Sequence, residues 1–595
     1  MNKEFNKNLF MNSTTCSDVR GHLSGQQLPT WVQGVLLYNG PSGGLCNTSS
    51  RNSDSGDSSV SRKHWMDGLS MMSSFKIQEK GKYITFTKKN LRSDEYIREH
   101  EQASSSRHHS TFPSPNIEYS TQMVDSNNYQ ISVYQSPGPM RRNIRRFKGE
   151  GSMSNYRSSS MEKLMMEEEA RDNCNSSFYQ FGDLLLATND TSFERIVDPD
   201  TLETGDLIDM SHLFNMKSVR PLKDHNGDYY NLTASVVTGN KYHFIKFKRP
   251  SPEVNYKGDN FPTETKFIST IPSRFPNHIG YFHSFGMTDN YLIFCEQPMT
   301  AWNGCPGERN HFYIVDKNTG RNIEINYVTD RSYFFFNFVN CYESGEHIIV
   351  DMLTYDGPEV MDSMWVEKLK SSRSDFYGDS STSRLMRFVL PLNYMEQGID
   401  LNFGQWNEAT AIRSNDMINI RPKIITPEYG MESPKINPHF NFRRYGYTYV
   451  VGWIHGLNPR NSFSNSITKI DVDTGMTTVW KTGDEFEHPS EIVFVPDPSG
   501  SCEDDGVIIS CVTNSRDRQG SYLVFINACN MQVHLFVAIC SNGKGSETDS
   551  GKKKYHGSSV NCPLLIHEAV VIPPTPTHKP TQNLIGFPEE AATQV

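Results

Sequence analysis

Short apolar or alternating runs, separated by turn-forming residues, fill the chain from residue 171 to about residue 540. Examples are GDLLLATND (182–190), HFYIVDKNTGRNIEINYV (311–328) and SITKIDVDTGMTTVW (466–480). The NTG and DTG tripeptides inside two of these stretches are hairpin signals. Helical periodicity is nearly absent. Many evenly spaced short strands without crossover helices predict a large all-β repeat fold, and a β-propeller takes this many strands into one domain.

Composition divides the chain into ordered and disordered parts. Of the 595 residues, 36% are hydrophobic, a low share for a compact globule, whereas the aromatic share of 11% favours strands. We expect a disordered N-terminus over 1–20, a propeller over 21–540 and a mostly disordered tail over 541–595. A polar, mostly disordered insertion at 97–170 is expected to interrupt the propeller, because this stretch is rich in Ser, Pro and clustered charge.

Charge and targeting signals narrow the choice of partners. A formal net charge of −10 indicates no nucleic-acid partner, which would usually need a basic face. The basic run RRNIRR (141–146) could touch anionic lipid, but we interpret it as a solvated run within the insertion. The N-terminus lacks the apolar core of a signal peptide, and no run of about 18 apolar residues predicts a transmembrane segment. We therefore expect a cytoplasmic protein with reduced thiols.

Longer strings carry a resemblance to a known family. In chain order they are LPTWVQGVLLYNGP (28–41), HWMDGLSMMSSF (64–75), LRSDEY (91–96), DPDTLETGDLID (198–209), IPSRFPNHIGYFHSFGMTDNYLIFCEQP (271–298), ESPKINPHFNFRRYGYTYVVG (432–452), HPSEIVFVPDP (488–498) and EDDGVIIS (503–510). Together they resemble the carotenoid cleavage oxygenases, in the animal branch that includes the β-carotene oxygenases and the retinal-pigment isomerohydrolase. The resemblance covers roughly 20–96 and 171–540. It implies a seven-bladed β-propeller with a cap of loops or short helices.

The resemblance also implies a chemistry. Family members hold Fe(II) with four histidines near the propeller axis, and three glutamates orient those histidines from behind. Neutral imidazole suits Fe(II), and a carboxylate behind each ring fixes its orientation. The iron activates O₂ to cleave a double bond of a carotenoid or apocarotenoid. The implied cofactor is therefore Fe(II), and the implied partner is an apolar polyene, either a carotenoid or a retinoid.

The four histidine positions that the resemblance implies are only partly occupied by histidine in this sequence. His283 in YFHSFG matches the second family ligand, although the sequence pattern alone favours an ordinary strand histidine. Leu222 stands at the first ligand position, and Asn337 in FNFVNCYE stands at the third. His225 could replace Leu222 only by a three-residue shift, which turns the side chain to the other face of a strand. YHGSS (555–559) could supply His556 as the fourth ligand, or His556 is a loop histidine of the tail.

The carboxylate positions are better kept. Glu432 in ESPKIN and Glu491 in HPSEI match the family, and Asp190 in ATNDTSF replaces a glutamate with a carboxylate one methylene shorter. We expect His283, Leu222 and Asn337 to lie near one point on the axis. The three carboxylates would then form a ring behind them.

Two functions of different classes follow, with a third left open. The first is an Fe(II)-dependent carotenoid oxygenase, an oxidoreductase. The second is a pseudoenzyme that holds a carotenoid or retinoid without turnover, and the third is an interaction scaffold. Fe(II) is low in the affinity order of divalent metals, and changing one residue behind a ligand already costs about 10–100-fold in affinity or activity. Loss of one imidazole and exchange of another should cost more, so we expect iron binding to be damaged.

Overall fold

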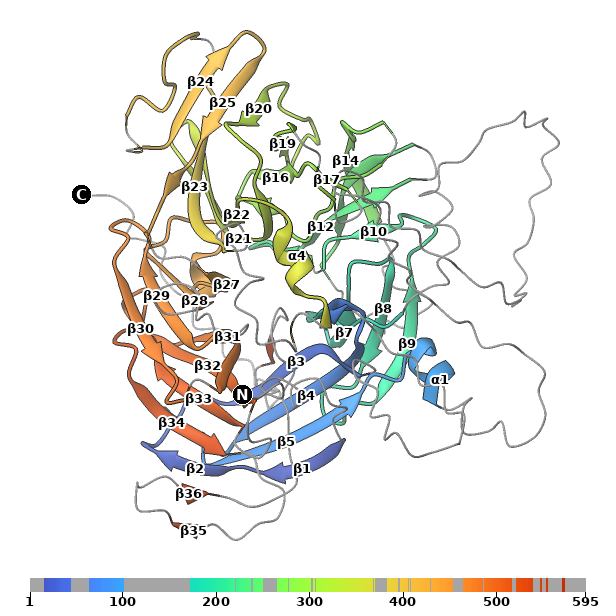
Figure 1. Ribbon diagram of the computed structural model, residues 1–595. Helices are drawn as coiled ribbons and strands as arrows, with labels where there is room; N and C mark the ends of the chain where they lie inside the picture. The colour runs from blue at the N-terminus through green and yellow to red at the C-terminus, as the bar shows by residue number, and fades with distance from the viewer. Residues whose placement is uncertain are drawn as a thin grey trace, which may run out of the picture.

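The computed structural model describes residues 15–43, 64–100 and 172–538, the last range with short gaps, and the short stretches 546–547, 553–554 and 570–572. These residues form mostly strands. Seven sheets of four to six strands are arranged around a central axis like the blades of a propeller, as Figure 1 shows. The prediction of an all-β, seven-bladed propeller is confirmed.

Three blades follow the insertion in the chain. One contains β6 (Ser177–Phe181), β7 (Leu184–Thr188), β8 (Phe193–Val197) and β9 (Thr204–Asp209). The next contains β10 (Met216–Lys217), β11 (Leu222–Lys223), β12 (Tyr229–Ser235), β13 (Lys241–Phe247) and β14 (Thr265–Pro272). The third contains β15 (Gly286–Met287), β16 (Tyr291–Glu296), β19 (His311–Asp316), β20 (Asn326–Thr329), β24 (Thr410–Ser414) and β25 (Met417–Arg421).

Two further blades come from the middle of the chain. One contains β21 (Phe334–Ser344), β22 (His347–Tyr355), β23 (Arg384–Pro391) and β26 (Lys423–Ile424). The other contains β27 (Met431–Lys435), β28 (Tyr447–Gly452), β29 (Ser466–Asp471) and β30 (Thr477–Lys481). Its strands become more exposed outward: β28 is almost entirely buried, whereas every residue of β30 is half-buried or exposed.

The last two blades join the two ends of the propeller. One contains β31 (Glu487–Pro496), β32 (Gly506–Asn514), β33 (Tyr522–Asn527), β34 (Val533–Ala538) and, from the start of the chain, β2 (His22–Gly25). The other contains β1 (Cys16–Arg20), β3 (Gly34–Gly43), β4 (Leu69–Gln78), β5 (Tyr83–Asn90) and, from the end of the chain, β37 (Val570–Ile572). The pairing of β2 with β34 closes the ring, so the fold needs contacts across almost its whole length.

Short helices and strand pairs complete the described elements. They are η2 (Trp65–Asp67), α1 (Asp94–His100), α4 (Glu359–Ser363), η5 (Pro438–Phe440) and the pairs β17 (Met299–Thr300) with β18 (Asn303–Gly304) and β35 (Ser546–Glu547) with β36 (Lys553–Lys554). Trp65 of η2 and Val360 of α4 pack in one apolar cluster with Phe334, Phe336 and Tyr355 of β21 and β22. This cluster fastens the short-helix cap to the propeller. No helix among the described residues is long and apolar enough to cross a membrane.

The expected domain limits need one correction. β1 lies inside the segment expected to be disordered and pairs with β5, from Cys16 opposite Lys88 to Arg20 opposite Thr85. Without β1, β5 would be an unpaired edge of its sheet. The polar segment forms a strand because its backbone can pair with this edge, and the composition of the segment does not predict such pairing. Residues 101–171, which hold nearly all of the expected insertion, lie outside the described residues. In the expected tail, β37 pairs with β3.

The predicted hairpins form at their turn residues. At the DTG turn between β29 and β30, Oδ1 of Asp471 accepts hydrogen bonds from the amides of Asp473 (3.0 Å) and Thr474 (2.9 Å). Gly475 follows with φ of +76°, a backbone conformation that a residue without a side chain adopts at little cost. The NTG turn after β19 repeats the arrangement, with Gly320 at φ +72°.

Six cysteines of the described residues have free thiols: Cys16, Cys174, Cys295, Cys341, Cys502 and Cys529. For the whole chain, reduced thiols stay a prediction.

Buried charge links adjacent blades. Arg387 on β23 lies directly opposite Asp351 on β22 and contacts it through two hydrogen bonds, from Nε to Oδ1 (2.8 Å) and from Nη2 to Oδ2 (2.7 Å). The Tyr445 hydroxyl, from the next blade, donates to Oδ2 of Asp351 at 2.7 Å. The side chains of Arg387 and Asp351 are only 7% and 0% exposed, so neither charge is compensated by water.

We predict that Arg387→Met lowers the free energy of unfolding by about 3–5 kcal/mol, because it leaves the Asp351 carboxylate buried without its cation. Denaturant unfolding followed by circular dichroism measures this loss. Arg444→Met is the matched control, since the Arg444–Asp473 pair is 74% and 50% exposed and such pairs contribute about 0–1 kcal/mol. Equal effects of the two changes would contradict the prediction.

Candidate functional site at the propeller axis

A cavity lies where strands from the inner edges of the blades meet. Its volume is about 300 Å³, and it is lined from five blades by residues on or beside β11, β15, β21, β27 and β31. Polar and apolar surface line it in nearly equal parts, and Phe285, Phe338, Phe442 and Phe494 are among the apolar side chains. Ligand cavities of proteins combine apolar walls with placed polar groups.

Irregular strands position the polar groups of this cavity. The pairing register shifts on β21 between Phe335 and Asn340, on β27 between Glu432 and Lys435, and on β31 between Pro489 and Ile492. A β-bulge of this kind turns a side chain away from its regular direction, and bulges often lie next to functional sites. Asn337 and Glu491 lie inside these shifts, and Glu432 borders one of them. Ser433, with φ of +52°, takes a conformation that non-glycine residues rarely adopt.

His283 lies in the loop before β15, lines the cavity and is 8% exposed. Its carbonyl oxygen accepts a hydrogen bond from the Val219 amide at 3.3 Å. The ring Nδ1 is 3.5 Å from Oδ1 of Asp190 and 3.4 Å from the Tyr281 hydroxyl. A carboxylate beside one ring nitrogen orients an imidazole so that the other nitrogen faces its ligand, although 3.5 Å is long for a hydrogen bond.

Glu432 is surrounded by donors. Nδ2 of Asn337 donates to its Oε2 at 3.3 Å, the Ser433 amide donates to the same oxygen at 3.3 Å, and the Tyr355 hydroxyl donates to Oε1. Burial raises the pKa of Glu432, while these donors act in the opposite direction. Because the amide nitrogen of Asn337 faces Glu432, the amide oxygen is the atom that Asn337 can offer to the cavity.

Glu491 and Lys435 form an ion pair on the cavity wall. The Lys435 Nζ atom is 2.5 Å from Oε1 of Glu491, and the two side chains are 16% and 3% exposed. The sequence-based reasoning missed Lys435, although it stands in the ESPKIN string three residues after Glu432. The sequence did contain a signal for Lys435, because a cationic residue follows so closely after Glu432, which was already assigned to the axis. A cationic side chain therefore stands beside a carboxylate that was expected to orient an imidazole.

Leu222 on β11 also lines the cavity and, like Phe442, packs against the buried cluster that contains Tyr230. His225 does not take its place: it is 44% exposed, and its ring lies 3.4 Å from Asp289. His556 lies outside the described residues. The structure thus brings Leu222, His283, Asn337 and Glu491 to one cavity, with Asp190 and Glu432 behind His283 and Asn337.

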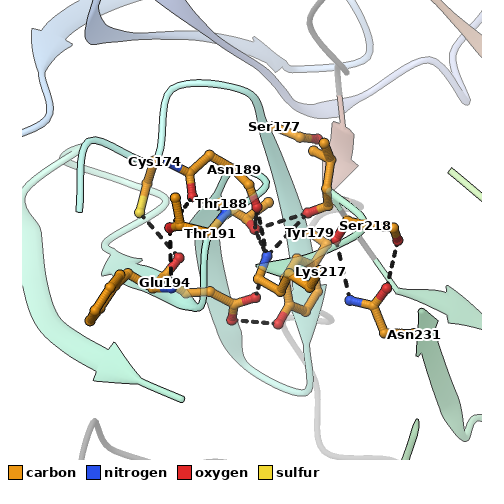
Figure 2. Close-up of polar contacts among 12 residues, drawn as sticks. Cys174, Ser177, Tyr179, Thr188, Asn189, Thr191, Glu194, Lys217, Ser218 and Asn231 are labelled. Carbon is orange, nitrogen blue, oxygen red and sulfur yellow. Dashed lines mark hydrogen bonds and ion pairs between the residues drawn. The ribbon is translucent and has the colours of Figure 1, made fainter. Parts of the chain in front are cut away.

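The buried side chain of Lys217 contacts Thr188, Asn189 and Glu194, as Figure 2 shows, and so anchors the segment directly before Asp190. The Lys217 amide donates to the Asp190 carbonyl at 3.0 Å, and its Nζ donates to the Asn189 carbonyl at 3.0 Å and to the Thr188 hydroxyl. The same Nζ lies 3.1 Å from Oε1 of Glu194, and both side chains are 1% exposed. Sequence-based reasoning missed this residue, because a lone lysine in NMKSV carries no motif.

The donor set does not fit the four-histidine iron centre that the resemblance implies. Within the described ranges, His283 is the one imidazole that lines the cavity. A leucine offers no lone pair, and an amide oxygen is a weaker ligand for Fe(II) than imidazole. Among the same residues, the one group of His, Cys, Asp or Glu side chains close enough to share a metal is the partly exposed Cys502, Asp504 and Asp505, which are not in the cavity lining.

Comparison with known proteins identifies the family. The family model described as retinal pigment epithelial membrane protein matches residues 12–541, most of the chain. This chain therefore belongs to that family, the carotenoid oxygenases. Among its relatives, a β,β-carotene 15,15'-dioxygenase of Gallus gallus is 28% identical over 89% of this chain and 97% of the relative. The corresponding protein of Homo sapiens is 27% identical, over 86% of this chain and 88% of the relative.

Other matches extend the picture. A mitochondrial carotenoid-cleaving dioxygenase of Mustela putorius furo is 28% identical over 87% of this chain and 90% of the relative. Among solved structures, a Glu150Gln mutant of the Synechocystis apocarotenoid oxygenase covers 96% of this chain and 99% of its own, with a TM-score of 0.63 and 16% identity. The cobalt-substituted form of the Synechocystis protein has a TM-score of 0.62 at 17% identity, with the same coverage. At this identity the structures support the shared propeller fold.

We predict that Lys217→Met destabilises the chain by about 3–5 kcal/mol, since Glu194 is left buried with its charge unpaired. It should also weaken the hold on the Asp190 loop. Thermal and denaturant unfolding measure the first effect. Lys76→Met is the matched control, because the Lys76–Asp200 pair is 21% and 78% exposed. A Lys217 variant as stable as the Lys76 variant would show that the buried pair contributes little.

Proposed function

We propose that this chain binds a carotenoid or retinoid in the axial cavity and does not cleave it through a four-histidine iron centre. Family membership supports a polyene ligand, because the relatives are named as dioxygenases of carotenoids. The observation that carries the proposal is the cavity wall itself. At two positions where the resemblance calls for imidazoles it presents Leu222 and Asn337, and the Glu491 carboxylate on the same wall is paired with Lys435.

The cavity suits part of a long apolar chain or the whole of a shorter one. Four phenylalanines and neighbouring aliphatic side chains line it, and moving an apolar polyene from water onto such a wall is favourable. Its volume of about 300 Å³ is at the low end for ligand cavities. This size favours a retinoid, or one end of a carotenoid, over an entire long carotenoid.

Electrostatics also disfavours iron at this point. The Lys435 ammonium lies on the same wall as His283 and Asn337, and it repels a second cation. The ammonium also pairs with the Glu491 carboxylate. In the family, a carboxylate at this position would raise the basicity of a histidine ligand. The imidazole that remains, with one amide oxygen, is a poor set for a metal that proteins hold by ligand number and geometry.

The oxygenase remains the second candidate. The contact of Asp190 with His283 and the burial of Glu432 favour it, because both keep the carboxylate arrangement that supports metal-bound imidazoles. A ligand from residue 556 would add one imidazole. Even then the cavity would have two imidazoles where the family uses four.

The cellular location and the partners of the protein are proposed from the sequence. We propose a cytoplasmic location and no nucleic-acid partner. Among its relatives, the Mustela putorius furo protein is named as mitochondrial, so cell fractionation is the direct test.

The full chain, purified alongside the Gallus gallus relative as a positive control, is predicted to contain far less than one iron per chain. With added Fe(II) and O₂ it should leave β-carotene intact while still binding retinol, as measured by quenching of protein fluorescence. Stoichiometric iron together with oxygen-dependent cleavage that His283→Ala abolishes would establish the oxygenase instead. Failure to bind either β-carotene or retinol would exclude both candidates.

A gain-of-binding experiment tests the alignment of the site. We predict that Leu222→His combined with Asn337→His raises Fe(II) binding, because it adds two imidazoles within the carboxylate frame. Metal titration followed by elemental analysis measures the gain. The control is Ile412→His, which adds a histidine at a position that is 40% exposed and outside the cavity lining. If the double variant binds no more iron than this control, the two positions do not face one metal site.

A further inference from the structure

The lysine on the cavity wall is unexplained by the binding of a hydrocarbon. Lys435 is the one lysine of the described residues that lines the cavity, and its side chain is 16% exposed. Lysine is rarely buried unless it is paired, and the pair with Glu491 carries a desolvation cost. A polyene without a polar end gains nothing from an ion pair on the wall. The arrangement fits a ligand that is apolar along its length and has one reactive polar end.

From this arrangement we infer that Lys435 forms a Schiff base with a conjugated apolar aldehyde bound in the cavity, with Glu491 as the counter-charge. This inference rests on the proposed polyene binding and specifies the ligand class, an aldehyde of the retinoid or apocarotenoid type. A lysine amine is the protein group that forms Schiff bases with carbonyl compounds.

The chemical step balances without an added oxidant or reductant. Glu491 takes a proton from the Lys435 ammonium, and the free amine nitrogen attacks the aldehyde carbon to form a C–N bond. The carbonyl oxygen accepts protons and leaves as water, while a C=N double bond forms. The imine nitrogen then holds a proton facing Glu491. The net change is ammonium plus aldehyde to iminium plus water, so the carboxylate has a cation beside it before and after.

Both partners are held in place by the strands. Lys435 ends β27 directly after the bulge, and its carbonyl accepts a hydrogen bond from the Thr448 hydroxyl at 3.1 Å. The Glu491 carbonyl accepts one from the Tyr38 hydroxyl at 3.1 Å. Reactive groups fixed on rigid elements need little reorganisation to react.

Other buried lysines lack this combination. Lys217 is 1% exposed, surrounded by oxygen acceptors and outside the cavity lining. Lys469 resembles Lys435 in burial and charge, since its Nζ lies 2.6 Å from Asp504 and the two side chains are 8% and 13% exposed. It too lies outside the cavity lining. Lys469 therefore provides the matched control.

The test is reductive trapping of the full chain with retinal. The protein is incubated with retinal, treated with borohydride and analysed by intact mass and peptide mapping. We expect one adduct per chain, located at Lys435. Lys435→Arg keeps the cation beside Glu491 but has no primary amine, so it should lose at least ten-fold of the adduct. Lys469→Arg should react like the unmodified chain.

The outcomes separate this inference from the proposed function. Retinol binding without a Lys435 adduct, or an adduct spread over other lysines, would overturn the Schiff base and leave polyene binding intact. Absence of both retinol binding and the adduct would overturn the two together. Peptide mapping of the unmodified chain decides the question even if the Lys435 variant does not fold.

Discussion

Closure of seven sheets into a ring is the constraint on which the other features of this molecule depend. Once β2 near the start of the chain pairs with β34 beyond residue 530, the innermost strands converge on one axis. Residues more than 250 positions apart, such as Leu222 and Glu491, then line the same cavity. The blades themselves are held by backbone pairing and by apolar clusters between neighbours, so side chains on the axis can change without loss of the fold.

Buried carboxylates limit which side chains can replace one another on the propeller axis, because each carboxylate needs a partner. Asp190, Glu432 and Glu491, which the resemblance predicts behind the ligand positions, each have a different partner here: the His283 ring, the donors of Asn337 and Tyr355, and the Lys435 ammonium. A carboxylate left without a partner in the interior is strongly unfavourable. A hydrogen-bond donor or a cation can stabilise such a carboxylate where no imidazole is present. The groups that line the cavity can then differ from metal ligands while the carboxylates stay in place.

Features that depend on neighbouring residues, such as the hairpin turns, could be predicted from the sequence. Features that depend on contacts between distant segments, such as β1 and Lys435, could not. The DTG turn predicted its hairpin, because the Asp471 side chain and Gly475 determine it within five residues. The prediction that His283 lies near the axis came from the resemblance, since a single histidine among aromatic residues has no pattern of its own. β1 was missed because its stability comes from the edge of β5, far away in sequence. Lys435 was missed because a bulge, which sequence does not announce, turns it toward Glu491.

Anomalous diffraction at the iron absorption edge, from crystals of the full chain grown with Fe(II) and retinol, tests the central claim most directly. We predict elongated ligand density in the cavity, an intact Lys435–Glu491 pair and no iron peak beside His283. An iron peak at full occupancy about 2 Å from a ring nitrogen of His283, the distance typical of metal-bound imidazole, would contradict it. In that case the cavity would be a metal centre completed by ligands that the present account does not assign.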